Sequence, residues 1–202
     1  ADPRIGLFDS EGQLIDSNDS FASDPRLAEA PPGLRPDAPR EAALVATLPP
    51  GAYTVVLNGS GGTGIGIVEV FELDAGPARI RNLSTRGRTG GGDSVLIGGL
   101  IVTGDAPQAL TLRGRGPSLA DFGVPNLLTD PVLELFDASG QRIDINDDHA
   151  THPEADLLGD LAPSDGREAA IRTILTPGAY TMILRSATGS PGIGIVEAFR
   201  DD

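Results

Sequence analysis

The chain contains an internal duplication, which limits what it can fold into. Motifs in residues 1–75 recur in the same order and at nearly constant spacing in residues 128–202. The matched pairs are Leu7-Phe8-Asp9 and Leu135-Phe136-Asp137, Asn18-Asp19 and Asn146-Asp147, Glu41-Ala42-Ala43 and Glu168-Ala169-Ala170, Pro50-Gly51-Ala52-Tyr53-Thr54 and Pro177-Gly178-Ala179-Tyr180-Thr181, and Gly64-Ile65-Gly66-Ile67-Val68-Glu69 and Gly192-Ile193-Gly194-Ile195-Val196-Glu197. Self-similarity of this kind predicts two copies of one structural module.

Residues 76–127 lie between the copies and have no counterpart in either. They carry a net charge of +3, whereas the first copy carries −8 and the second −9. Opposite charges predict that the central Arg residues pair with the acidic copies, within one molecule or between neighbours. Binding of a polyanion is the alternative. The whole chain, at −14, is predicted to bind no nucleic acid, and it has no apolar run long enough for membrane insertion.

The residue pattern inside each copy is typical of β-strands. Tyr53, Val55 and Leu57 alternate with Thr54 and Val56, and the second copy alternates in the same way. The 27 Gly and 17 Pro residues supply frequent turns. The sequence therefore predicts an all-β fold of tandem antiparallel β-sandwich modules of the jelly-roll-like kind. The expected divisions are a first module at 1–75, a central β segment completing a sandwich at 76–127, and a second module at 128–202.

Both copies carry motifs that resemble a known family. The Leu-Phe-Asp strand, the Gly turn, the Asn-Asp loop and the Pro-Gly-Ala-Tyr-Thr turn together resemble the bacterial pre-peptidase C-terminal type of β-sandwich. Two motifs of the central segment, Asn82-Leu83-Ser84-Thr85-Arg86-Gly87 and Arg113-Gly114-Arg115-Gly116-Pro117-Ser118, resemble a repeat of large bacterial exported proteins. The resemblance implies a bacterial protein located outside the cell or on its surface.

The order of the pieces departs from that repeat, in which the central-type segment precedes the sandwich half. Here the first copy has no such segment ahead of it within the sequence, whereas the second copy does. Three interpretations remain open: the first copy folds alone, residues 76–127 complete it, or another molecule completes it. An open sheet edge is a template for strand addition, so assembly from head to tail is one prediction.

Acidic loops at matching places in the two copies are candidate metal sites. Calcium is bound by six to eight oxygen ligands, and closely spaced Asp and Asn residues offer several. The candidate ligands are Asp16, Asn18, Asp19, Asp144, Asn146, Asp147 and Asp148. The spacing differs from an EF-hand loop, and Asp and Asn also stabilise turns through bonds to the backbone. Calcium binding and turn formation therefore both remain interpretations of these loops.

The chain is predicted not to be an enzyme. Cys and Lys are absent, so no thiolate or Schiff-base chemistry is available. Gly92-Asp93-Ser94 is similar to the start of a hydrolase motif, but the histidines, His149 and His152, lack the acid spacing of that family. The same two histidines form at most part of a zinc site.

These observations favour a structural protein. The predicted function is that of an extracellular subunit of a filament, sheath or surface layer, a head-to-tail homopolymer assembled by strand exchange and stabilised by calcium. The alternative is a carbohydrate-binding or cell-wall-binding accessory module of a larger exported protein. Sugar sites use exposed aromatic rings, whereas Trp is absent and Tyr53 and Tyr180 are predicted to face the core.

Overall fold

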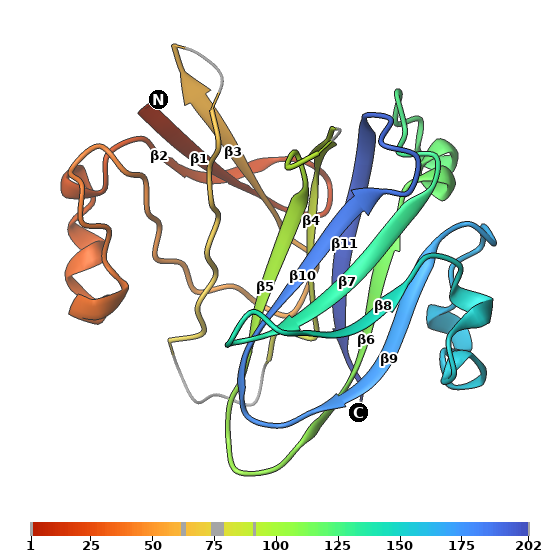
Figure 1. The fold of residues 1–202 in the computed structure, drawn as a ribbon. Coiled ribbons are helices and arrows are strands. Elements are labelled where there is room, and N and C mark those ends of the chain that lie inside the picture. Colours follow the sequence, from red (N-terminus) through yellow and green to blue (C-terminus); the bar gives the residue numbers. More distant parts are fainter. Residues whose placement is uncertain (1, 62–63, 74–78, 91, 202) are drawn as a thin grey trace. The chain divides into compact units, whose positions relative to one another are not determined.

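The computed structural model describes residues 2–61, 64–73, 79–90 and 92–201. The chain divides into two compact units, Ala1–Arg79 and Ile80–Asp202, here called the N-terminal and C-terminal units. Figure 1 shows that strands dominate both, with helices confined to short 3₁₀ turns. The predicted all-β antiparallel fold class is thereby confirmed. Among the described residues, no helix is both long and apolar enough to cross a membrane.

The C-terminal unit is a sandwich of two four-stranded antiparallel sheets (Figure 1). One sheet has the order β5 (Leu96–Val102), β10 (Gly178–Ser186), β7 (Pro131–Asp137), β8 (Arg142–Asn146). The other has the order β4 (Asn82–Thr89), β11 (Gly192–Arg200), β6 (Gln108–Arg115), β9 (Ala169–Leu175). Short 3₁₀ helices lie between strands: η4 (Pro117–Phe122), η5 (His149–Thr151), η6 (Ala155–Leu157) and η7 (Gly159–Leu161).

The core of this unit is aliphatic and lies between the two sheets. Leu112, Leu133, Leu184 and Val196 are almost fully buried, and each comes from a different strand. Their alternation with more exposed neighbours is the period of two expected for strands that bury one face. Gly114 lets the sheets approach, because a Cβ at this position would lie 2.5 Å from a methyl carbon of Leu184.

The three central strands are built into the second copy. β5 pairs with β10, β4 pairs with β11, and β6 pairs with both β11 and β9. Each sheet of the sandwich therefore combines strands from residues 82–115 with strands from the second copy. In one interpretation residues 76–127 complete the first copy, but the strands of this segment pair with the second copy in this structure.

The N-terminal unit contains one three-stranded sheet among its described residues, in the order β2 (Leu14–Asn18), β1 (Asp2–Phe8), β3 (Thr54–Ser60). It also has the 3₁₀ helices η1 (Phe21–Ser23), η2 (Pro25–Ala28) and η3 (Pro32–Leu34). The register repeats that of the second copy. Leu7 faces Val55 as Leu135 faces Met182, and both β1–β2 and β7–β8 have a register shift directly after the Leu.

Two strands of the second copy have no strand counterpart in the first. Residues 41–48 and 64–73 correspond in sequence to β9 and β11 but form no sheet. The reason is the position of β6, which supplies the ladder partner of β9 and one of the two partners of β11. The other partner of β11 is β4, also from the central segment. Without these partners, backbone groups cannot form a ladder, whatever the side chains.

The two copies are therefore expected to respond differently to the same truncation. Leu184→Ala removes a fully buried side chain from the C-terminal core and should lower the free energy of unfolding of that unit by about 3 kcal/mol. Leu57→Ala, at the matching position, removes a half-buried side chain and should lower the stability of its unit by roughly half as much. Urea unfolding followed by peptide-resolved hydrogen exchange reports each unit separately. Equal losses would contradict the difference in packing.

Candidate functional site

The two Asn residues of the predicted calcium loops hold the backbone together. Asn146 Oδ1 accepts a hydrogen bond from Ala170 N (3.0 Å), and its Nδ2 donates to Asp148 O (3.0 Å). Asn18 repeats the arrangement, accepting from Ala43 N (3.1 Å) and donating to Ser20 O (3.2 Å). Both side chains are buried. Each Asn thus joins the end of a strand to the start of the segment that follows the loop.

Three of the five carboxylates in these loops have partners within the chain, and the bonds given for Asp148 involve its backbone. Asp16 pairs with Arg26 at 2.6 Å, and the hydrogen bond from Arg26 is the main reason that the pKa of Asp16 lies below its usual value. Asp144 Oδ2 lies 3.2 Å from His152 Nε2, and Asp147 Oδ1 accepts from Asp148 N. Asp19 is exposed.

This geometry supports turn formation more directly than metal binding. Among the described residues, no group of three or more His, Cys, Asp or Glu side chains is placed to hold a metal ion. The Asn carbonyl oxygens that calcium would use already accept backbone N–H groups. Calcium binding stays a prediction.

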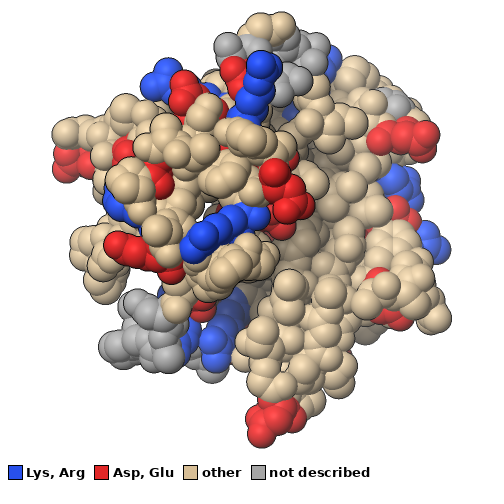
Figure 2. Space-filling view, turned by 90° about the vertical axis from the view of Figure 1, so that its left-hand side faces the viewer, with Lys and Arg blue, Asp and Glu red and all other residues tan. Residues whose placement is uncertain are grey.

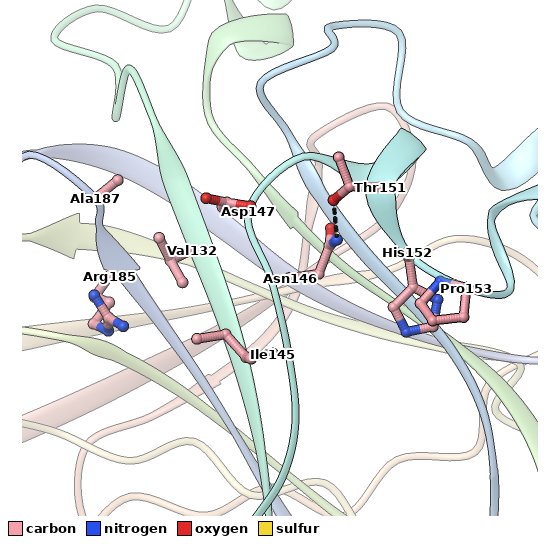
Figure 3. Close-up of a pocket in the computed structure, with 9 residues that line it drawn as sticks. All are labelled: Val132, Ile145, Asn146, Asp147, Thr151, His152, Pro153, Arg185 and Ala187. Atoms are coloured by element: carbon pink, nitrogen blue, oxygen red, sulfur yellow. Dashed lines mark hydrogen bonds between the residues drawn. The ribbon is translucent and has the colours of Figure 1, made fainter.

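A shallow hollow of about 370 Å³ lies beside the second of these loops (Figure 3). Val132, Ile145, Arg185 and His152 contribute to its lining, and Figure 3 shows Thr151 bonded to Asn146 within it. Both ring nitrogens of His152 are engaged: Nδ1 accepts from Glu154 N, and Nε2 faces Asp144. The imidazole therefore stabilises the loop, and the Thr151 hydroxyl in the lining donates to Asp148 O.

Charged side chains cluster on the face of the β4–β11–β6–β9 sheet that points away from the core, on β6 and β11 and directly before β9. Glu168 is fully buried, and its Oε1 accepts from Gly116 N, Ser118 N and Ser118 Oγ at 2.8–2.9 Å. Glu168 Oε2 lies 3.6 Å from Arg115 Nε and has no hydrogen bond. This carboxylate therefore fixes the turn that follows β6.

Arg113 occupies a second, adjoining site. Its Nε and Nη2 both lie 2.9 Å from Glu197 Oε2, and its guanidinium stacks 4.4 Å from the centre of the Phe199 ring. Nη1 donates to Leu161 O (3.1 Å). Burial lowers the pKa of Arg113, and the neighbouring Glu197 carboxylate opposes that effect. The prediction that central Arg residues pair with the acidic copies is confirmed for Arg113 and Arg115. We call Arg113, Arg115, Ser118, Glu168, Glu197 and Phe199 the Arg–Glu network.

The first copy retains the acceptor half of this network without the donor half. Glu41 corresponds to Glu168, Glu69 to Glu197 and Phe71 to Phe199. Glu41 is exposed and receives a 3.4 Å hydrogen bond from Ala38 N. Glu69 is exposed and, among the described residues, has no hydrogen bond or ion pair, and Phe71 is 44% exposed. The Arg residues that would face them come, in the second copy, from the central segment.

Apolar positions show the same contrast. Val68 is 44% exposed where Val196 is 1%, Val55 is 37% where Met182 is 3%, and Leu48 is 37% where Leu175 is 4%. We call Leu48, Val55 and Val68, together with the unpaired edge of β3, the open positions. Side chains that build the core of one copy thus meet solvent in the other.

Sequence reasoning missed the Arg–Glu network. The signal was present in the repeat, since Glu41 and Glu69 recur as Glu168 and Glu197 among apolar residues. A carboxylate repeated in an otherwise apolar strand indicates a buried partner of opposite charge. The charge of the central segment predicts that its Arg residues pair with carboxylates, but not which carboxylates they contact.

Surface charges form no single-sign region on the face displayed in Figure 2. Red and blue side chains are interspersed there and separated by uncharged surface (Figure 2). The net charge of −14 is therefore not gathered into one acidic patch on that face.

Comparisons with known proteins identify a similar fold and no family. No family model matches the chain, and no curated protein matches it. Among solved structures, the pre-peptidase C-terminal domain of collagenase from Bacillus anthracis is similar, with a TM-score of 0.38 and 12% sequence identity. The similarity covers 58% of this chain and 89% of that domain. The domain is of the type that the sequence motifs resemble, but a similarity this low supports no functional statement.

The interpretation of the Asn loops can be tested with calcium. Asn146→Ala leaves the buried N–H of Ala170 without an acceptor and should lower the stability of the C-terminal unit by about 1–3 kcal/mol. If the loop only forms a turn, the loss is the same in calcium and in chelator. Asp147→Asn is the matched control. A calcium-dependent rise in melting temperature that Asp147→Asn abolishes would instead establish the metal site.

The buried network gives a second test. Glu168→Ala removes the acceptor of Gly116 N and Ser118 N and leaves Arg115 with one carboxylate fewer, so unfolding of the C-terminal unit should become easier by about 3–5 kcal/mol. Glu41→Ala, the matched change in the first copy, should alter stability by less than about 0.5 kcal/mol because the side chain is exposed. Urea unfolding measures both. A comparable loss at Glu41 would mean that this residue already has a buried partner.

Proposed function

We propose that this chain is an extracellular structural protein, a β-sandwich subunit of a filament, sheath or surface layer. The observation that supports the proposal is the contrast between its two copies. In the C-terminal unit β10 pairs on both sides, whereas its counterpart β3 has, among the described residues, one strand partner, and the open positions of the first copy are exposed. In such a subunit the C-terminal unit folds stably, and the exposed apolar side chains of the first copy would be buried by association with another strand.

The open positions are chemically suited to strand addition. An unpaired edge presents a row of backbone N–H and C=O groups, which pair with an added strand. Exposed Val55, Val68 and Leu48 would bury apolar surface at the same time, at roughly 25 cal/mol for each Å² removed from water. Backbone pairing and apolar burial in one place favour association over small-molecule binding.

The accessory-module alternative receives less support. Both tyrosine hydroxyls are used inside the chain, since Tyr53 donates to Pro49 O (2.8 Å) and Tyr180 to Thr176 O (2.9 Å). The Tyr180 ring packs against the C-terminal core. These rings are therefore poor platforms for sugar stacking. The location outside the cell comes from the resemblance of the motifs to exported proteins.

The proposal predicts self-association through the open positions. The purified chain should form larger species as its concentration rises, measured by light scattering after size-exclusion chromatography and by electron microscopy. Val68→Glu should weaken association at least tenfold, because a charge at this position opposes burial. Ile143→Glu is the control, since Ile143 is similarly exposed (41% against 44%) but lies on β8 of the closed unit. Monomers at all concentrations would refute assembly.

A further inference from the structure

We infer that the first copy is built to receive a further three-stranded segment of the same type as residues 80–127, supplied by another repeat unit. The inference rests on the proposed function, because it names what covers the open positions. Three independent features of the first copy carry it: the acceptor side chains, the placement of the backbone, and the glycines.

The acceptor side chains match the Arg–Glu network. In the C-terminal unit, Glu197 and Phe199 together hold Arg113, and the first copy keeps both as Glu69 and Phe71. Glu168, which fixes the Gly116–Ser118 turn, is kept as Glu41. A segment outside any strand has no need of a carboxylate and an aromatic ring at the positions that enclose a guanidinium. The pattern matches a strand that ends in Arg-Gly-Arg and is followed by a Gly-Pro-Ser turn, as at Arg113–Ser118.

The backbone at Glu41 and in the β1–β3 pair is already placed as in the completed copy. Phe21 N donates to Glu41 O at 2.8 Å, as His149 N donates to Glu168 O at 2.8 Å. The hydrogen bonds from Ala43 N to Asn18 and from Ala170 N to Asn146 repeat in the same way. The register of β1 with β3 also equals that of β7 with β10. The first copy therefore presents the same half-sheet to an incoming segment as the second copy does.

Glycines mark the path of the incoming backbone. A Cβ at Gly192 would collide with the backbone of Leu127 and Leu128, and one at Gly194 would lie 3.1 Å from Arg115 O. The first copy has Gly64 and Gly66 at these positions. At Gly66, a Cβ would meet only the side chain of Leu57. Gly66 thus meets Leu57 as Gly194 meets the matching Leu184 (2.8 Å), and the backbone of Arg115 is a further neighbour at Gly194 that comes from the central segment.

The central segment of this chain cannot complete both copies at once. The sequence has two acceptor halves and one central segment, and that segment pairs with the second copy. Exchange between identical copies of this sequence would fill one half only by emptying another. Association of identical copies therefore leaves one acceptor half unfilled for each chain, and complete filling needs an additional segment of the same type.

The test adds one. Residues 80–129 are joined directly ahead of Asp2 in the full chain, which reproduces the junction ahead of Asp130 in the second copy. Hydrogen exchange of residues 53–59 and 64–71 is then compared with that of the native chain. Completion should slow exchange there by at least about 100-fold, since these amides would enter a closed sandwich. Unchanged exchange would overturn the inference.

A charge exchange tests the specificity of the fit. In the extended chain, Glu69→Arg alone, or Arg113→Glu in the added segment alone, should remove most of the protection, and combining them should restore it. Glu69→Arg in the native chain should change nothing, because Glu69 is exposed there. Glu29→Arg, also at an exposed position, is the control for charge. If none of these substitutions changes the protection from hydrogen exchange, any added strand would suffice, and the inference would be overturned.

The outcomes separate this inference from the proposed function. Protection in the extended chain together with a native chain that remains monomeric would support the fit and refute assembly. Assembly of the native chain without protection in the extended chain would do the reverse. If both hold, the extended chain should also lose association through the open positions.

Discussion

The structure depends on one strand, β6, which lies between β11 and β9 and pairs with both. Backbone groups removed from water must be paired, so without β6 the strand β9 has no ladder partner and β11 keeps only β4. The same strand carries Arg113 and Arg115, whose ion pairs bind the neighbouring strands by their side chains. Backbone pairing and charge pairing thus enter the fold together, from a single short segment.

This dependence explains what the sequence could and could not predict. The duplication, the Tyr-x-x-x-Leu strands and the turn before them were predictable, because alternation and turn chemistry are local. The state of residues 64–71 was not, since Gly64-Ile65-Gly66-Ile67-Val68-Glu69 has the same sequence as the start of β11 and yet forms no strand. Strand formation there is decided by a partner distant in the sequence.

The candidate sites show the same division. Asn18 and Asn146 are residues of a type that binds metals. Their observed role, which is to join two backbone segments, depends on hydrogen bonds from Ala43 and Ala170, which are 25 and 24 residues away. Desolvation offsets much of the attraction in a buried ion pair such as Arg113–Glu197, so its presence is weak evidence of added stability. A repeated Glu is therefore better evidence of a specific neighbour than of a strong one.

The sequence shared by residues 64–69 and the start of β11 offers β4 two partners during synthesis. β4 pairs antiparallel with β11, placing Asn82 opposite Phe199, and Phe71 stands at the matching position of the first copy. Only ten residues separate Phe71 from Asn82, a length that a hairpin loop can span. Because chains emerge and fold from the N-terminus, the central segment meets the first copy before its final partner has been made. The native pairing then forms in one of two ways: either the central segment stays unpaired until the second copy has been made, or the second copy displaces the first from it. The order of translation therefore affects how this chain folds.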